Sequence, residues 1–309
     1  MKILVLGGNG FIGSHIVDEL LAARHEVCVF NRSPEAWRKP LPAVNYYLGD
    51  FSNTPMLAEA LHGVDAVVHL ISTTVPSTSN HDPIADIQSN LEGSVRLFQL
   101  MVSAKVGRII FLSSGGTVYG IPSVLPVPET HPLNPICSYG IVKVAIEKYL
   151  GMFEYLYGLK PLIIRASNPY GPRQGHEGVQ GVVSTFMHKI LSDEKVILWG
   201  DGSIKRDYFY ITDLARICRM AAESELTGVI NAGSGKGTSL VELVRMIEAA
   251  TNKRLDIEYK AARPFDVSEI VLSIEKARTQ LNWAPKISMQ EGLTLQFDWM
   301  TKNSNKYQI

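Results

Sequence analysis

The chain has 309 residues, enough for one large hydrophobic core with a smaller appended lobe. Its 30 Lys and Arg residues balance 30 Asp and Glu residues, so we expect no binding of nucleic acid or of an anionic membrane surface. No apolar stretch has the length of a secretory signal or of a membrane span. Three widely spaced cysteines lack metal-ligand spacing, which is typical of a reducing compartment: Cys28, Cys137 and Cys218. These features predict a cytoplasmic globular protein.

Short apolar runs alternate with amphipathic segments through the first half. Helices are predicted at Ile12–Ala23, Ile84–Ala104 and Tyr139–Tyr157. Strands are predicted at Ile3–Leu6, Val27–Phe30, Tyr46–Leu48, Ala66–Leu70, Ile109–Leu112 and Leu162–Arg165. Continuous apolar strands separated by helices imply a parallel sheet that is buried on both faces. We therefore expect an α/β fold of the Rossmann type, with a doubly wound parallel sheet.

The second half predicts a smaller mixed α/β lobe. The segment Ala166–Gly181 is too rich in Gly and Pro for regular structure and long enough to be functional. Beyond it we expect a helix near Val182–Ser192, a strand at Val196–Trp199, a turn at Asp201-Gly202, and helices near Asp213–Glu223 and Met289–Met300. The predicted domains are a dinucleotide-binding domain, residues 1–167 with returning segments near 207–233, and a substrate lobe, residues 168–206 and 234–309. The two should pack around one cleft.

A glycine-rich turn, "LGGNGFIG", joins the first strand to the first helix. Gly7, Gly10 and Gly13 allow a sharp bend and a close approach of a pyrophosphate to the backbone. The amides of Phe11 and Ile12 would then face that negative charge from the helix N-terminus. The turn predicts a dinucleotide site, with a plain strand-to-helix turn as the alternative.

The end of the second strand leaves the choice of cofactor open. An acidic residue there would accept from the ribose 2′-hydroxyl of NAD, but this chain has Asn31 and then Arg32. Asn31 no longer repels a 2′-phosphate, and Arg32 either binds one, as in NADP, or is a solvated surface residue. Asp50 either accepts from the adenine amino group or only forms a turn. Two apolar neighbours of the predicted site complete the expected cofactor contacts: Phe51 and Leu70.

The motif "SYGIVK" places Tyr139 and Lys143 four residues apart on one helix face. A phenol with a pKa near 10 is a poor base at neutral pH, and a nearby ammonium lowers that pKa. We therefore expect Lys143 to activate Tyr139 for proton transfer. The alternative is an aromatic core contact beside a solvated lysine.

The order of motifs along the chain resembles the extended short-chain dehydrogenase/reductases, in the sugar-nucleotide epimerase/dehydratase branch. The motifs are "GGNGFIG", "DAVVHL", "SSGGTVYG", "SYGIVK", "SNPYGPRQ", "GDGSIKRDYFYITDLA", "RPFDV" and "LNWAP". The resemblance implies an enzyme that keeps NAD bound and acts on a nucleotide sugar, with Tyr139 as proton acceptor and Lys143 on the nicotinamide ribose. It also implies a homodimer, formed by the helices Ile84–Ala104 and Tyr139–Tyr157.

The stretch "SSGGTVYG" departs from the pattern of these relatives. Gly115 stands where they usually carry Ser or Thr, and Gly116 and Thr117 stand where the dehydratases carry Asp and Glu. Without two carboxylates, dehydration lacks its acid and base. We expect the glycines to leave room, with Thr117 or Ser114 reaching the sugar hydroxyl or the catalytic phenol; both hydroxyls could instead cap the strand end.

The resemblance also implies residues that hold the nucleotide. Arg206 and Arg263 would pair with the diphosphate, while Asn168 hydrogen-bonds it. Asp266 would take a ribose hydroxyl, and Trp199 would lie beside the base. Surface ion pairs for the arginines and a core role for the tryptophan are the alternatives.

One more position bears on the choice of sugar. In UDP-galactose 4-epimerases a residue a few places after the "RP-x-D" arginine lines the sugar pocket, and the matching residue here is Ile270. A smaller side chain there predicts space for the N-acetyl group of a UDP-N-acetylhexosamine. Alternatively, Ile270 packs in the core of the lobe.

These observations support three functional hypotheses. The first is a sugar-nucleotide 4-epimerase that acts through a 4-keto intermediate. An NADPH-dependent reductase of nucleotide 4-keto sugars is the alternative, favoured by Asn31 and Arg32. A regulator that binds nucleotide and has lost its chemistry is the third, against which Tyr139 and Lys143 argue.

Overall fold

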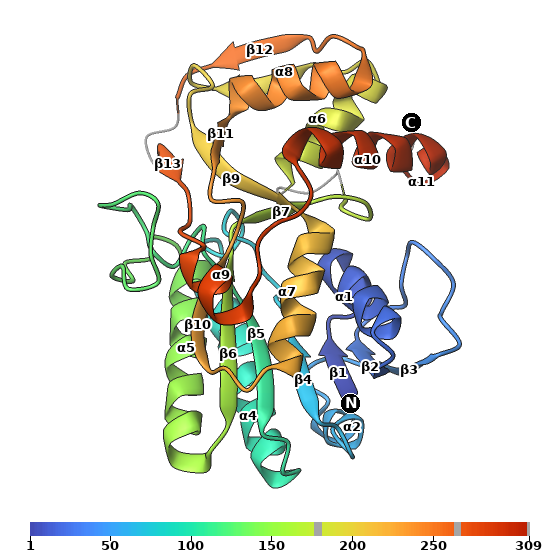
Figure 1. The fold of residues 1–309 in the computed structure, drawn as a ribbon, viewed down its shortest axis with the longest axis vertical. Coiled ribbons are helices and arrows are strands. Elements are labelled where there is room, and N and C mark those ends of the chain that lie inside the picture. The colour runs from blue at the N-terminus through green and yellow to red at the C-terminus, as the bar shows by residue number, and fades with distance from the viewer. Residues whose placement is uncertain (176–180, 263–266, 308–309) are drawn as a thin grey trace.

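A seven-stranded parallel sheet forms the centre of the larger lobe in the computed structural model, which describes residues 1–175, 181–262 and 267–307 (Figure 1). The strand order is β10-β6-β5-β4-β1-β2-β3, and every pair in it is parallel. The strands are β1 (Lys2–Leu6), β2 (Glu26–Asn31), β3 (Val44–Leu48), β4 (Ala66–His69), β5 (Arg108–Ser114), β6 (Lys160–Ala166) and β10 (Gly228–Ala232). The predicted doubly wound sheet is confirmed, since the order reverses between β1 and β4.

Helices cover both faces of this sheet. On one face, α1 (Phe11–Ala22) and α7 (Ile211–Glu223) pack in one apolar cluster with the sheet. On the other, α4 (Gly93–Ser103) and α5 (Ser138–Tyr157) pack in a second cluster. The short α2 (Thr54–Ala60) packs in the second cluster as well, through Leu57 and Ala60. The single helix predicted over Ile84–Ala104 is three consecutive segments, α3 (Pro83–Asp86), the π-helix η1 (Ile87–Glu92) and α4.

The second lobe is smaller and mixed, as predicted. One sheet contains β7 (Asn168–Tyr170), β9 (Lys205–Tyr210), β11 (Gly237–Ser239) and β13 (Glu269–Ile270), and β8 (Val196–Trp199) pairs with β12 (Ile257–Lys260). Its helices are α6 (Val182–Leu191), α8 (Leu240–Thr251), α10 (Met289–Lys302) and α11 (Ser304–Tyr307). The helix α9 (Glu275–Leu281) lies instead against β10, at the edge of the seven-stranded sheet (Figure 1). Strand β7 corrects the expectation of irregular structure throughout 166–181, because pairing with β9 satisfies the backbone. Strand β9 continues past Asp207 to Tyr210, and the predicted domain boundaries stay a prediction.

The carboxyl ends of β5 and β6 meet the small lobe. Val127, in the connection after β5, bridges to Leu272, and the amide of Val127 donates to the carbonyl of Val271 at 2.7 Å. The fully buried Asp207 accepts hydrogen bonds from the backbone amides of Ser234 and Leu272. These contacts fix the small lobe against the edge of the sheet at which doubly wound proteins bind ligands.

Candidate active site

The glycine turn after β1 has the geometry of a phosphate site. Gly7 has φ +87°, and its amide donates to the carbonyl of Phe30 at 2.9 Å. A methyl group on Gly13 would overlap the carbonyl of Gly7 and approach Gly8 Cα to 2.6 Å, so α1 can lie this close to the turn only with glycine there. Gly10 caps α1 without a side-chain hydrogen bond. The amides of the first turn, Phe11 and Ile12 among them, therefore have no intrahelical acceptor and suit an anion.

Asn31 uses its side chain to hold the loop that follows β2. Its Nδ2 donates to the carbonyl of Ser33 at 2.9 Å, and Asn9 Nδ2 donates to the same carbonyl at 2.8 Å. The backbone amide of Asn9, in the glycine turn, donates to Asn31 Oδ1 at 3.4 Å. Asn31 thus couples the phosphate turn to the position where a dinucleotide places its adenosine ribose. Arg32, the next residue, is exposed.

Asp50 has the geometry of the turn former that the sequence left as its alternative. Its Oδ1 accepts from the amide of Ser52 at 2.9 Å and from Ser52 Oγ at 2.6 Å. These hydrogen bonds lower the pKa of the Asp50 carboxyl, and the positive charge of Arg32 lowers it further. Phe51 is buried against the ring of His69, with centroids 5.5 Å apart, and Leu70 is partly buried after β4.

Tyr139 and Lys143 lie in the first two turns of α5. Lys143 is buried, and its Nζ donates to the carbonyl of Leu112 in β5 at 3.0 Å. The same Nζ lies 5.5 Å from the centroid of the Tyr139 ring and 4.7 Å from that of Phe111. The ammonium is therefore fixed between α5 and β5.

The expected activation of Tyr139 by Lys143 stays a prediction, and burial acts against it. Burial raises the pKa of Tyr139 to about 12, the charge of Cys137 adds to this, and hydrogen bonding with Ser114 lowers it only in part. Burial also lowers the pKa of Lys143 to about 8, although the negative charges of Glu147 and Asp86 raise it in part. Burial penalises the charged form of each group, and this effect outweighs their proximity.

The stretch before Tyr119 contains a hydroxyl without a partner. Thr117 Oγ1 is buried and has no hydrogen-bond partner among the described residues. A buried hydroxyl usually has one, so this atom suits the hydroxyl of a ligand. The side chain of Ser114, at the end of β5, lowers the pKa of Tyr139 through a hydrogen bond. Both residues thus remain candidates for contacts in the site.

The structure corrects the expectation that both glycines of this stretch leave room. A methyl group on Gly115 would overlap Leu272 Cδ1 and lie 3.1 Å from Leu272 Cδ2, whereas nothing lies within 4 Å of the same group on Gly116. Leu272 thus takes the space at Gly115. Ile270 is only 3 % exposed and packs with Val118 and Leu272, so its side chain is in the core, which was the alternative interpretation of this residue.

The predicted substrate residues come from several segments of the small lobe. Asn168 Nδ2 donates to the carbonyl of Asp207 at 3.0 Å. Arg206 Nη1 donates to the carbonyl of Val267 at 2.8 Å, beside the segment that holds two further predicted contacts. Trp199 is 38 % exposed, which fits an aromatic side chain open to a ligand better than a core residue. The two further contacts, Arg263 and Asp266, lie outside the described residues.

Two buried polar groups near Tyr139 and Lys143 were not predicted. Glu147 pairs with Arg165 through two hydrogen bonds, of 3.1 and 2.6 Å, and accepts from Ser113 Oγ. Its position four residues after Lys143 was the one available signal. Asp86 accepts from Ser138 Oγ at 2.7 Å, across 52 positions, and no local pattern marks that contact.

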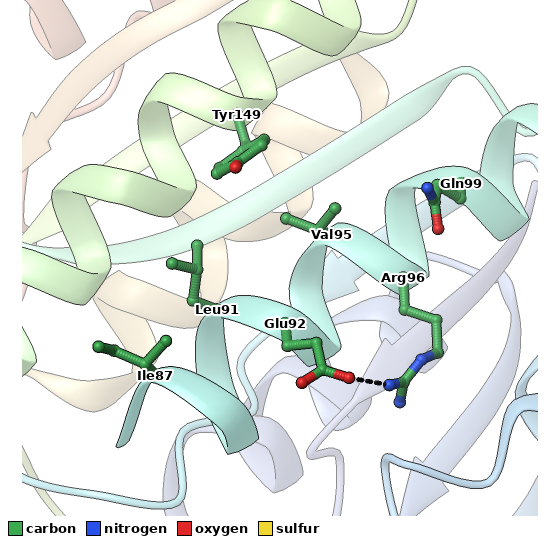
Figure 2. A pocket seen from close by; sticks show the side chains of 7 residues that line it. All are labelled: Ile87, Leu91, Glu92, Val95, Arg96, Gln99 and Tyr149. Atoms are coloured by element: carbon green, nitrogen blue, oxygen red, sulfur yellow. Dashed lines mark hydrogen bonds and ion pairs between the residues drawn. The ribbon is translucent and has the colours of Figure 1, made fainter. Parts of the chain in front are cut away.

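A groove with apolar and polar lining lies on the outer face of η1, α4 and α5, and it contains none of the predicted catalytic residues. Figure 2 shows Tyr149 of α5 facing Leu91 and Val95 across it, with Glu92 paired to Arg96 at its rim. The other lining residues are Ile87 and Gln99. No described group of His, Cys, Asp and Glu could hold a metal ion. No described helix is long and apolar enough to cross a membrane.

Comparison with known proteins decides the family. The model of the NAD dependent epimerase/dehydratase family matches residues 3–233, which span the glycine turn, Tyr139 and Lys143. The chain belongs to this family. A dTDP-4-dehydro-6-deoxyglucose reductase of Escherichia coli is 32% identical over 301 residues, which cover 94% of this chain and 95% of the relative.

Two solved structures of the family are close in fold. A UDP-glucose 4-epimerase of Thermotoga maritima with UDP-glucose is 36% identical, covers 98% of this chain and 100% of its own, and has a TM-score of 0.93. A UDP-glucose 4-epimerase of Thermus thermophilus in complex with NAD is 34% identical, covers 97% and 99%, and has a TM-score of 0.90. The chain is thus an NAD-dependent enzyme of the epimerase/dehydratase type. The glycine turn and the open amides of α1 fit that cofactor.

Proposed function

We propose that this protein is a sugar-nucleotide 4-epimerase that acts on a UDP-hexose or a UDP-N-acetylhexosamine through a 4-keto intermediate. The observation that carries the proposal is the pair of Tyr139 and Lys143 beside a strand end without carboxylates at Gly116 and Thr117. Proton transfer at one hydroxyl is available there, and the acid–base pair needed for dehydration is absent from those two positions. The similarity to UDP-glucose 4-epimerases supports the same reaction.

In this proposal the chain orients the sugar and moves one proton. NAD, when bound on the glycine turn, supplies the acceptor and the donor of hydride for C4. Tyr139 takes the proton of the C4 hydroxyl and later returns it, and Thr117 Oγ1 donates to or accepts from a sugar hydroxyl. Lys143, held by the Leu112 carbonyl, keeps a positive charge beside the phenol and favours its ionised form when that proton leaves. Trp199, Asn168 and Arg206 would hold the nucleotide, together with Arg263 and Asp266.

The second candidate is the NADPH-dependent reductase of a nucleotide 4-keto sugar. One observation favours it: Arg32 is exposed beside Asn31. An exposed guanidinium suits a 2′-phosphate. The relative from Escherichia coli is a dTDP-4-dehydro-6-deoxyglucose reductase.

One experiment separates the two candidates. The purified protein is incubated with UDP-glucose or UDP-N-acetylglucosamine without added cofactor, and the C4 epimer is followed by chromatography. An epimerase recycles its bound NAD and forms the epimer, and denaturation releases about one NAD per chain. A protein that releases no NAD and oxidises added NADPH only with a 4-keto sugar would be the reductase.

We also propose a cytoplasmic homodimer, assembled through the groove of Figure 2. Apolar side chains on both of its sides are exposed, with Ile87 42 % and Tyr149 39 % exposed (Figure 2). Two more apolar residues of α5 are exposed, Met152 at 39 % and Tyr155 at 88 %. Single exposed apolar residues are ordinary, but a continuous apolar face on two neighbouring helices usually marks an interface. A second copy of the chain, related by a two-fold axis, would cover both helices with the same surface.

A further inference from the structure

The side chain of Asp86 lies at the end of α3 and is fully buried. Its Oδ1 accepts from Thr74 Oγ1 at 2.7 Å and from Asn90 Nδ2 at 2.8 Å, and its Oδ2 accepts from Ser138 Oγ at 2.7 Å. All three donors are neutral, and no described cation forms an ion pair with this carboxylate. Burying a carboxylate without a paired cation lowers the stability of the fold, so the presence of Asp86 here calls for a reason beyond packing.

The donor Ser138 is the first residue of the catalytic helix α5. Cys137 precedes it and provides no side-chain cap. The first amides of α5 are instead capped from the loop after β4, because Ser138 N donates to Asn80 Oδ1 at 2.9 Å and Tyr139 N donates to Ser79 Oγ at 3.0 Å. This loop is joined to the π-helix η1 through Asn90, which Asp86 also binds. The position of Tyr139 thus depends on a polar cluster that is remote in sequence.

We propose that Asp86 is a positioning residue of the active site, which fixes the start of the catalytic helix through Ser138 and whose charge acts on Tyr139 and Lys143. The functional part of this inference rests on the proposed roles of Tyr139 and Lys143. The structural and electrostatic parts do not depend on which reaction the enzyme performs.

The charge of Asp86 acts in the same direction on both catalytic groups. Burial is the main cause of the high pKa of Tyr139 and the low pKa of Lys143, and the Asp86 charge raises both pKa values. Cys137 adds to the effect on Tyr139, and Glu147 acts on Lys143 in the same sense. The buried His69 lies within range of the Lys143 charge. A negative charge here therefore favours a protonated phenol together with an ammonium.

The substitution Asp86→Asn keeps the shape of the side chain and removes its charge. An amide at this place can still accept from Thr74 and can donate to Ser138 Oγ, so the local fold should persist. The variant should lower the pKa of Lys143, which can be followed in the purified protein by NMR of lysine labelled with ¹³C at Cε. The signal is assigned by its absence in Lys143→Arg. This readout requires no turnover, and a purely structural role would leave it unchanged.

The kinetic readout is the dependence of turnover on pH. Loss of the Asp86 charge lowers the pKa of Tyr139, so the limb of the profile that Tyr139 controls should move to lower pH, whether it acts as acid or base. Asp82→Asn is the matched control, because Asp82 caps α3 from an exposed position and Asn caps equally well. That control should move neither the profile nor the Lys143 signal.

A third variant tests the positioning role on its own. Ser138→Ala removes the hydrogen bond to Asp86 and keeps the charge, so turnover should fall by about tenfold while the pKa of Lys143 stays unchanged. An unchanged turnover in Ser138→Ala would overturn the positioning role even if Asp86→Asn does not fold. An unchanged Lys143 pKa in folded Asp86→Asn would overturn the electrostatic role. A shifted Lys143 signal in a protein that epimerises no sugar would support Asp86 and count against the proposed reaction.

Discussion

Leu272 of the small lobe occupies the space into which a side chain at Gly115 would project. A methyl group on Gly115 would overlap Leu272 Cδ1, and Leu272 itself is fully buried beside Val118 and Val127. The end of β5 therefore has an apolar wall at the position where the resemblance implied a hydroxyl. The nearest buried hydroxyl without a partner in this stretch is that of Thr117.

Gly115 and Leu272 should therefore be coupled energetically. Gly115→Ser overpacks the contact and should lower the free energy of unfolding by about 1–3 kcal/mol. Leu272→Ala leaves a cavity and should cost about 2–5 kcal/mol. The double variant should lose less than the sum of the two, by at least about 1 kcal/mol, in urea unfolding. Additive losses would show that the two side chains do not share this space.

Tyr139→Phe keeps the aromatic ring and deletes the hydroxyl. Turnover should fall by about a hundredfold or more, because the variant lacks the hydroxyl that exchanges a proton with the sugar in the proposed reaction. Calorimetry should show nearly unchanged binding of the nucleotide sugar, and the circular dichroism spectrum should match that of the wild type. Turnover within about threefold of wild type would remove Tyr139 from the mechanism.

The residues after β2 should set the choice between NAD and NADP. Asn31→Asp adds a carboxylate that repels a 2′-phosphate, and it should shift the ratio of the two binding constants toward NAD by about tenfold. Arg32→Ala should act in the same direction if Arg32 binds that phosphate. Lys39→Ala, which removes another exposed cation of the same loop, is the control and should leave the ratio unchanged. If Arg32→Ala and Lys39→Ala change this ratio equally, Arg32 does not bind the 2′-phosphate directly, and only the overall positive charge of the loop matters.

Lys143 should lower the stability of the protein at neutral pH. Its folded-state pKa of about 8 lies below the usual 10.5, so the folded chain binds fewer protons than the unfolded chain between these values, and wild-type stability should rise there with pH. Lys143→Met should therefore be inactive but more stable at pH 7, by up to about 3 kcal/mol. That gain should shrink above pH 8 and be small near pH 10.5 in urea unfolding. A gain that does not change with pH would mean that packing, and not charge, explains it.

The proposed dimer predicts a mass of twice the 34.1 kDa chain in light scattering at micromolar concentration. Ile87→Lys places a charge in the groove and should shift the protein toward the monomer. Leu295→Lys on α10 is a matched control, since Leu295 is 41 % exposed and Ile87 42 %. A monomeric wild type, or equal effects of both variants, would refute this interface.

Much of the fold and part of the site follow from local patterns. The alternation of apolar strands and helices predicted the parallel sheet, and the glycine turn and the Tyr139–Lys143 pair were placed correctly on their elements. The π-helix inside the segment Ile84–Ala104 was not predicted, because its apolar spacing is that of one continuous helix. Strand β7 was missed for a related reason: three residues that include a proline carry little strand signal until β9 pairs with them.

The sequence by itself determined the order of the elements, the glycines of the phosphate turn and the four-residue spacing of Tyr139 and Lys143, since these depend on residues close together in the chain. Only the tertiary structure decided that Leu272 fills the space at Gly115, that Ile270 is buried and that Asp86 holds Ser138. The tertiary structure also decided the direction in which the pKa values of Tyr139 and Lys143 shift. Volume, burial and desolvation are set by atoms that distant segments bring together, and no spacing along the chain encodes them.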